Sequence, residues 1–260
     1  MKNIYLLTLL LLTLNACSEG ELKTLSSNEV SGNQVKDIFE ITERVVPYVY
    51  TSAIDLSSLD VQKKKQAFIN LMIPSILIAK HELEQERNKV LELGINPHDL
   101  SPSDEAYLSA LQKKYKCTSH SELLLRMRTH PTSILIAQAA IESGWGTSRF
   151  YKDANNVFGV WSYDKNEPRM RASEDREGTS VYVKKYNSLP ESIASYFQTI
   201  ARGPYAGFRE KRNETNEVFE LTPHLLRYSE LREVYVERVQ ELIKYNQLER
   251  YDSYLLEGNK

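Results

Sequence analysis

Hydrophobic and polar positions along this chain recur mostly with a helical period. Residues 133–143 are apolar nearly all round, which predicts a helix that is buried on every side. Residues 119–128 carry their apolar side chains on one side, which predicts a helix with a single packing face. Residues 230–250 predict a final helix that packs on the core through Leu231, Val234, Tyr235, Val239, Leu242 and Ile243.

A period of two residues is confined to one short region. Residues 179–184 alternate between polar and apolar side chains, which predicts a strand, and the expected partner strand is residues 168–172. Ser188 and Glu191 then have the spacing of a capping box, which predicts that a helix follows over residues 192–200. The predicted fold class is therefore mainly α with a small β-hairpin lobe, an α+β fold.

Composition divides the chain into five segments. Residues 1–16 are predicted to be a signal peptide, and residues 17–36 are polar, which predicts a tether. Residues 37–99 are predicted to form a largely helical extension. Residues 100–212 are predicted to form the core, and residues 213–260 a C-terminal helical region.

Pro74 and Gly94 interrupt the expected helices of the extension. Pro74 lies inside the apolar run 68–78, so the helix is expected to kink or restart there. Gly94 follows a charged helix over residues 82–93, as a C-cap glycine does. An extended piece is expected at residues 45–50.

The N-terminal residues predict export and lipidation. A positively charged start, Met1-Lys2-Asn3, precedes an apolar run over residues 4–14, which is typical of a secretory signal and too short for a membrane span. Small residues then lead into Cys17, which resembles the lipobox of bacterial lipoproteins. Ser18 is similar to the residue found in lipoproteins sorted to the outer membrane. The expected location is the periplasmic face of the outer membrane, with a lipid anchor on Cys17.

Charge and cysteine content exclude several classes of function. The formal net charge is −2, so nucleic-acid binding has no electrostatic basis. Cys117 has no intrachain partner if Cys17 is acylated, and a buried, inert thiol is the expected state. The five histidines are scattered and form no Cys/His cluster with metal-ligand spacing, so no metal site is predicted.

One carboxylate stands at the end of the predicted buried helix. Glu142 shares a helix face with Leu135, Gln138 and Ala139, and Gly144-Trp145-Gly146 follow it directly. Loss of water on the apolar side raises the pKa of such a carboxyl group. A carboxylic acid that is protonated near neutral pH can donate a proton to a leaving oxygen, so Glu142 is predicted to be the general acid of glycoside cleavage.

The same segment carries a resemblance to a known family. Residues 136–150, followed by Asn155-Asn156-Val157-Phe158-Gly159, resemble the endo-β-N-acetylglucosaminidase domain of peptidoglycan hydrolases, glycoside hydrolase family seventy-three. Residues 68–74, 227–230 and 235–236 are similar to the Bax-like branch of that family, so the resemblance covers roughly residues 63–252. It implies a lysozyme-like fold and cleavage of β-1,4 bonds in peptidoglycan glycan strands, with no cofactor.

The second carboxylate of the reaction has several candidates. The resemblance implies an acid in the β-lobe shortly before a glycine, and Glu174 is the nearest match, with Asp175 and Glu177 as rivals on the loop 173–178. An inverting enzyme needs its two carboxyl groups roughly 6.5–9.5 Å apart, whereas a retaining enzyme needs a closer pair. If no such acid acts, the N-acetyl group of the substrate is the alternative nucleophile.

Further residues are expected to contact the substrate. Tyr186 matches a tyrosine of the family pattern near the cleft, and a packed strand-end tyrosine is the alternative. Trp145, Asn156 and Phe158 are expected to shape sugar subsites, although Asn156 equally fits a structural turn. A basic and aromatic stretch is predicted either to pair with the carboxylates of peptidoglycan peptides or to form a solvated helix terminus: Arg202, Tyr205, Arg209 and Arg212.

Two classes of function remain open at this point. The first is an enzyme, an endo-β-N-acetylglucosaminidase that acts on peptidoglycan, with lytic transglycosylase or muramidase chemistry as the alternative. The second is a non-catalytic scaffold lipoprotein that binds peptidoglycan. Both have the glycan strands and the membrane as partners, and the sequence points to no protein partner.

Overall fold

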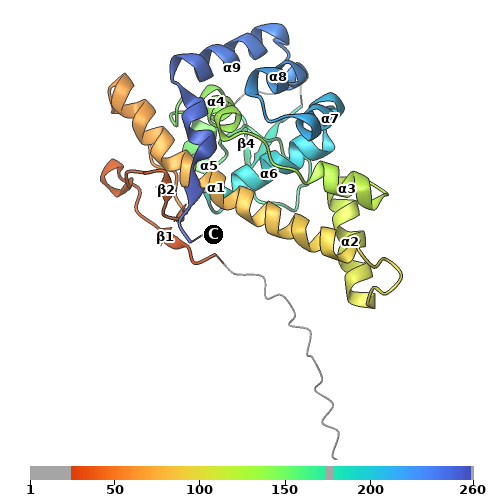
Figure 1. Cartoon of the computed structure of the whole chain (residues 1–260). Coiled ribbons are helices and arrows are strands. Elements are labelled where there is room, and N and C mark those ends of the chain that lie inside the picture. Colours follow the sequence, from red (N-terminus) through yellow and green to blue (C-terminus); the bar gives the residue numbers. More distant parts are fainter. Residues whose placement is uncertain (1–24, 174–178, 259–260) are drawn as a thin grey trace, which may run out of the picture.

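The computed structural model describes residues 25–173 and 179–258 of the 260-residue chain. Helices dominate the described part, and the strands are short (Figure 1). The α-helices are α1 Val61–Leu93, α2 Pro102–Tyr115, α3 His120–Arg126, α4 Thr132–Ser143, α5 Arg149–Ala154, α6 Leu189–Arg202, α7 Ala206–Glu214, α8 Val218–Leu221 and α9 Glu233–Tyr245. The strands are β1 Asn28–Val30, β2 Arg44–Val45, β3 Tyr48–Tyr50, β4 Arg169–Arg171, β5 Tyr182–Lys184 and β6 Leu255–Leu256.

Side-chain caps fix the starts of several helices. Ser119 accepts a hydrogen bond from the backbone N–H of Glu122 at 3.2 Å and opens α3. Ser188 accepts one from the backbone N–H of Glu191 at 3.4 Å and opens α6, as its spacing predicts. The Glu191 carboxylate reaches back to the backbone N–H of Asn187 at 2.7 Å. Each cap satisfies a backbone donor that the helix itself leaves without a partner.

Helix α1 is continuous over 33 residues and runs through Pro74. The expected restart at Pro74 is therefore wrong. Proline removes one hydrogen bond of the helix ladder, but every residue from Phe68 to Ala79 is buried. Burial of this apolar segment of the helix offsets the lost bond, because each fully buried large apolar side chain contributes about 1.5–3 kcal/mol.

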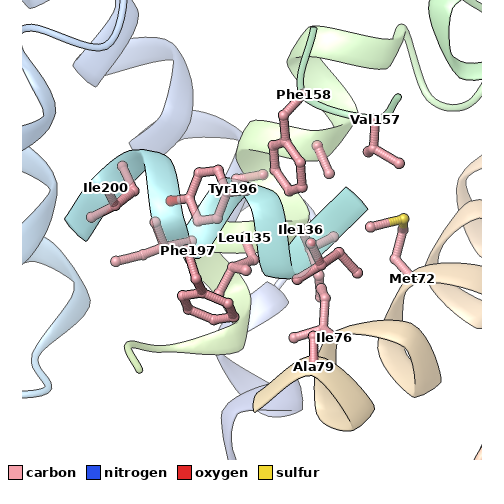
Figure 2. Close-up of a cluster of buried hydrophobic side chains, with 14 of the residues drawn as sticks. Met72, Ile76, Ala79, Leu135, Ile136, Val157, Phe158, Tyr196, Phe197 and Ile200 are labelled. Atoms are coloured by element: carbon pink, nitrogen blue, oxygen red, sulfur yellow. The ribbon is translucent and has the colours of Figure 1, made fainter. Parts of the chain in front are cut away.

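Helix α1 is part of the central core. It packs against α4 and α6, and Figure 2 shows Ile76 of α1 beside Ile136 of α4 within the buried cluster. The buried side chains of these helices belong to one hydrophobic cluster. Residues 37–99, expected as an extension of the domain, thus supply one wall of its core.

The described part of the expected tether is not free. Strand β1 pairs in parallel with β3, with Asn28 opposite Tyr48 and Val30 opposite Tyr50. A 3₁₀ turn follows at Val35–Asp37. The tether prediction is therefore wrong from residue 28 onwards. The polar composition of residues 17–36 gave no sign of the strand, because strand pairing uses backbone groups and needs few apolar side chains.

The predicted hairpin lobe is confirmed. Strands β4 and β5 are antiparallel, with Arg169 opposite Lys184 and Arg171 opposite Tyr182. Trp161 forms a further antiparallel bridge to Val183. The loop between the two strands includes residues 174–178, which lie outside the described residues. The predicted fold class, mainly α with a small β-hairpin lobe, is thus confirmed.

Helix α9 begins later than the sequence pattern suggests. It starts at Glu233, and Tyr235, Val236, Val239 and Ile243 are its buried residues. Leu231 and Val234, expected on the packing face, are 52% and 53% exposed. The chain then returns across the domain, and β6 pairs in parallel with β2. Among the helices in the described ranges, none is long and apolar enough to cross a membrane.

Candidate active site

Glu142 lies in the last turn of α4, on the wall of a cleft of about 720 Å³. Glu142 is half-buried. One side of the cleft is made by the hairpin lobe and the segment before it, and the other by α6 and the residues after it. The cleft is lined by Lys116, Glu142, Phe158, Gly159, Val160, Trp161, Tyr163, Asp164, Glu167, Lys184, Ser195, Gln198, Thr199, Arg202, Gly203, Tyr205 and Tyr228.

A left-handed turn ends α4 directly after Glu142. Gly144, Trp145 and Gly146 have φ values of 58°, 58° and 75°. A Cβ atom at Gly146 would be crowded, since it would lie 3.1 Å from Leu56 Cδ1 and from Phe68 Cδ2. Ser143 Oγ accepts the backbone N–H of Gly146 at 3.0 Å. The two glycines therefore allow a turn that an ordinary residue would strain, and the turn stops α4 with Glu142 at the cleft.

Burial sets the electrostatics of Glu142. Loss of solvent raises the pKa of its carboxyl group, and a hydrogen bond from the Tyr235 hydroxyl opposes that rise only in part. The rings of Tyr228 and Tyr235 stack with their centroids 5.4 Å apart. The Glu142 charge also raises the pKa of Tyr205 and Tyr228, after burial. Glu142 therefore sits among tyrosines that stay neutral, and its acid form is favoured.

Behind Glu142, polar side chains continue into the core. Gln138 Nε2 donates to the Tyr235 hydroxyl at 3.1 Å, and the Tyr196 hydroxyl donates to Gln138 Oε1 at 2.6 Å. His130 Nε2 lies 3.1 Å from the Tyr196 hydroxyl. Burial, followed by the charges of Arg212 and Lys80, lowers the pKa of His130 well below its usual value. His130 is therefore neutral, and the row of polar groups carries no net charge.

Glu174, Asp175 and Glu177 lie outside the described residues. Two described carboxylates that the sequence reasoning did not single out, Asp164 and Glu167, line the cleft.

Glu167 forms an ion pair with Lys184 at 2.8 Å. Partial burial raises the pKa of Glu167, but hydrogen bonds from Lys184 and Ser162 and the Lys184 charge outweigh this, so its pKa is lowered. Glu167 is therefore ionised where Glu142 favours its acid form. Two carboxyl groups with pKa values pushed apart are the arrangement that glycoside cleavage uses.

Two of the residues expected to contact sugar line this cleft. Phe158 and Tyr205 do so, and Phe158 also stacks on Tyr196 with ring centroids 4.3 Å apart.

Trp145 lies elsewhere, in an open groove of about 690 Å³ that it shares with Tyr245. The ammonium group of Lys65 lies 5.2 Å from the centroid of the Trp145 ring and 4.9 Å from that of Tyr245. The left-handed turn after Glu142 thus directs the indole away from the Glu142 carboxyl group, so Trp145 and Glu142 do not line the same cleft.

Asn156 is buried, and its side chain forms hydrogen bonds to backbone groups. Its Nδ2 donates to the carbonyl oxygens of Val160 at 3.0 Å and of Lys184 at 2.8 Å, and its Oδ1 accepts the Val160 N–H at 2.9 Å. Only 1% of Asn156 is exposed. These contacts agree with the structural-turn interpretation of Asn156. The side chain connects the turn before the hairpin lobe to β5 by hydrogen bonds.

Tyr186 lines a neighbouring groove of about 380 Å³ rather than the cleft of Glu142. Its hydroxyl donates to Ser195 Oγ at 2.7 Å, and Ser195 and Gln198 line both hollows. Burial raises the pKa of Tyr186. Tyr186 thus reaches the cleft only through Ser195.

Two members of the basic and aromatic stretch over residues 202–212 line the cleft, and the other two bind backbone carbonyl groups. Arg202 and Tyr205 line the cleft. Arg209 donates to the carbonyl oxygens of Ile200 and Gly203 at 3.0 Å each. Arg212 is 1% exposed and donates to the carbonyl oxygens of Leu125 and Arg126 at 3.0 and 2.9 Å. These two arginines join α7 to its neighbours, and the expected carboxylate pairing or solvated terminus is wrong for them.

Sequence reasoning also missed two tyrosines of the C-terminal region. Tyr228 and Tyr235 face Glu142, although no chemistry was expected of this region. The resemblance to the Bax-like branch at residues 227–230 and 235–236 was the signal available for them. Within residues 25–173 and 179–258, no group of three His, Cys, Asp or Glu side chains is arranged to hold a metal ion.

The sequence profile described as mannosyl-glycoprotein endo-beta-N-acetylglucosaminidase matches residues 119–251, which is just over half of the chain and includes the cleft residues from Glu142 to Tyr228. The chain belongs to the glucosaminidase family. It is therefore a glycoside hydrolase, and the enzyme hypothesis of the sequence is confirmed over the non-catalytic scaffold.

Two curated proteins are similar to this glucosaminidase. Protein bax of Escherichia coli (strain K12) is 28% identical over 221 residues, which covers 78% of each chain. Exo-glucosaminidase LytG of Bacillus subtilis (strain 168) is 28% identical over 147 residues, which covers 54% of this chain and 50% of LytG. The chain thus spans about half the length of LytG.

Solved structures with a related arrangement are more distant. The catalytic domain of the autolysin Auto from Listeria monocytogenes is 22% identical, with a TM-score of 0.47 and coverage of 75% of this chain and 92% of that domain. The glycoside hydrolase domain of FlgJ from Salmonella typhimurium is 19% identical, with a TM-score of 0.38 and coverage of 55% and 87%.

Proposed function

We propose that this glucosaminidase hydrolyses β-1,4 bonds of peptidoglycan glycan strands after N-acetylglucosamine, with Glu142 as general acid. The observation that carries the proposal is the half-buried Glu142 on the wall of the cleft, whose pKa is raised by burial. Peptidoglycan as substrate is supported by the resemblance of residues 136–159 to peptidoglycan hydrolases and by the signal-like pattern of residues 1–16.

In the proposed reaction, the Glu142 carboxyl group donates its proton to the glycosidic oxygen as the bond to the anomeric carbon breaks. The Glu142 carboxylate that results accepts a hydrogen bond from Tyr235. That bond is worth more in the transition state, where charge develops on Glu142, than in the ground state, so it contributes to catalysis. Glu142 then regains its proton before the next turnover.

Glu174 is the proposed second carboxylate, because it is the nearest match to the family pattern in the β-lobe. A described alternative is Glu167, which lines the cleft and is kept ionised by Lys184. Either carboxylate activates water in an inverting reaction or attacks the anomeric carbon in a retaining one. Separate Glu174→Gln and Glu167→Gln variants discriminate between them by the loss of turnover.

Cleavage within strands, rather than from their ends, is supported by the aromatic side chains along the cleft. Trp161 is 38% exposed and Tyr163 is 86% exposed, and both line the cleft with their ring centroids 6.2 Å apart. Exposed ring faces of this kind stack on sugar rings. Because they belong to the hairpin lobe side rather than to the surroundings of Glu142, they offer contacts to sugars away from the scissile bond.

The proposed location is the periplasmic face of the outer membrane. Cys17, the proposed lipidation site, lies outside the described residues, and the support comes from the signal-like segment and the residues around Cys17. Fractionation of cells that express the wild-type chain or Cys17→Ser tests this proposal. We expect the wild type in the outer-membrane fraction and Cys17→Ser outside it; equal distribution would refute lipid anchoring.

The activity is tested by mass spectrometry of purified peptidoglycan treated with the full-length chain or with Glu142→Gln. We expect fragments with reducing N-acetylglucosamine ends from the wild type and none from Glu142→Gln. Fragments with 1,6-anhydromuramic ends would assign lytic transglycosylase chemistry instead. Reducing N-acetylmuramic acid ends would assign a muramidase.

A further inference from the structure

A row of buried polar side chains leads from the core to Glu142. It comprises His130, Tyr196, Gln138 and Tyr235, with contacts of 3.1, 2.6 and 3.1 Å in that order, and Tyr235 completes it by its hydrogen bond to Glu142. His130, Gln138, Tyr196 and Tyr235 are each at most 2% exposed. Away from water, each hydrogen bond is electrostatically stronger, and an unpaired group is costly.

The donors in this row all point the same way. Gln138 Oε1 can only accept, so the proton between it and the Tyr196 hydroxyl belongs to Tyr196. The Tyr196 oxygen then accepts from His130 Nε2, which carries the single N–H of a neutral imidazole. This tautomer is consistent with His130 Nδ1, which is buried and has no hydrogen-bond partner, because an orphaned acceptor costs less than an orphaned donor at this position.

The orientation of the Gln138 amide decides where the Tyr235 proton goes. With Nε2 toward Tyr235, the Tyr235 oxygen accepts from Gln138 and its own proton is directed to Glu142. A reversed amide would present Oε1 to Tyr235, which would then donate to Gln138 and leave the Glu142 carboxylate without this donor. Tyr196, held by His130, keeps the amide from reversing.

We propose that Gln138 is a positioning residue for the proton transfer at Glu142: through its amide it directs the Tyr235 hydroxyl toward the carboxylate that forms when Glu142 gives up its proton. The inference rests on the proposed role of Glu142 as general acid. Among the described residues, Tyr205, Tyr228 and Tyr235 are the titratable groups whose pKa values the Glu142 charge raises. The three tyrosines keep their protons through the working pH range, because burial raises their pKa values. Five charged side chains line the same cleft: Lys116, Asp164, Glu167, Lys184 and Arg202.

The test replaces the amide by an apolar side chain of similar length. In Gln138→Met the Tyr235 hydroxyl loses its orienting donor, and we expect kcat to fall about tenfold, the equivalent of one hydrogen bond to a charged group. The Tyr235 hydroxyl is then no longer held toward Glu142, so it stabilises the ionised form of Glu142 less and the pKa of Glu142 rises further. Since the general acid must be protonated, the alkaline limb of the pH profile of kcat/KM should move to higher pH.

A matched control is Gln240→Met on α9. Gln240 Nε2 donates to Thr222 Oγ1 at 2.7 Å, so this variant also loses a partly buried glutamine hydrogen bond, but one remote from the row. We expect its pH profile to match that of the wild type. Tyr235→Phe should move the alkaline limb in the same direction as Gln138→Met, and the double variant should not exceed Tyr235→Phe.

The experiment is kcat and kcat/KM against pH for these full-length variants, beside Glu142→Gln and a thermal melt of each. If Gln138→Met lowers Tm and leaves the pH profile unmoved, Gln138 is only structural and the inference is wrong. If Gln138→Met does not fold, Tyr196→Phe, which frees the Gln138 amide to reverse, must move the alkaline limb upward for the inference to hold. If Glu142→Gln keeps wild-type activity, the proposed function fails instead, which separates the two failures.

Discussion

Replacing Asn156 by alanine separates a structural role from a substrate-binding one. The side chain makes three hydrogen bonds to the backbone, two to Val160 and one to Lys184, at 2.8–3.0 Å. They join the turn that follows α5 to β5. Asn156→Ala removes all three at once and leaves the polar backbone groups of Val160 and Lys184 without those partners.

The expected cost follows from the number of bonds. At about 1 kcal/mol of net stability for each hydrogen bond, Asn156→Ala should lower the free energy of unfolding by about 3 kcal/mol. For a chain of this size, 1 kcal/mol corresponds to a change of roughly 2–4 °C in Tm, so Tm should fall by roughly 6–12 °C. At temperatures where the variant is folded, KM should change little, because Asn156 is 1% exposed.

The assay combines a thermal melt and urea unfolding with kcat and KM on soluble glycan strands. Asn166→Ala is the control, because Asn166 is an exposed asparagine in the segment that leads to β4, and its effect on stability should stay within about 0.5 kcal/mol. An unchanged Tm for Asn156→Ala together with a large rise in KM would refute the reasoning and return Asn156 to the sugar subsites.

Three further predictions concern the turn, the ion pair and the cleft. Gly146→Ala should lower the free energy of unfolding by at least about 1–2 kcal/mol in urea titrations, because Gly146 has φ 75° and its Cβ would crowd Leu56; an unchanged midpoint would contradict this. Lys184→Met should cost about 0.5–1 kcal/mol at neutral pH by loss of the pair with Glu167. The pKa of Glu167 is depressed in the folded state, so this contribution exists above its unfolded pKa and should vanish as pH falls through the folded one; a pH-independent difference would refute the assignment. Tyr163→Ala should raise KM for long glycan strands and leave it unchanged for short oligosaccharides, whereas an equal effect on both would argue against the proposed contacts along the strand.

Local signals in the sequence predicted the elements that depend on neighbouring residues. The caps at Ser119 and Ser188 and the apolar residues of α4 are short-range features, and the helices begin and end close to the predicted positions. The alternation in residues 179–184 predicted β5 in the same way. The position of Glu142 at the end of a buried helix also follows from such local patterns.

Tertiary contacts explain what the sequence did not reveal. Pro74 predicts a break, and only the burial of α1 on both sides of it explains the continuous helix. Tyr235 looked like one more apolar position of a packing face, since its role depends on a contact with Glu142 from a helix 93 positions away along the chain. Trp145 adjoins Glu142 in sequence, yet the left-handed turn places it in another groove.

The pairing of β1 with β3 sets how far the folded domain can lie from Cys17. Because β1 already belongs to the folded domain at Asn28, only eleven residue steps separate it from Cys17. A fully extended chain covers at most about 3.3–3.6 Å per residue, so this connecting segment is no longer than about 40 Å. If Cys17 carries the proposed lipid, the domain can reach only the layer of cell wall next to its own membrane. A longer segment between Cys17 and Asn28 would then increase the depth of wall that one molecule can reach, with no change in the cleft.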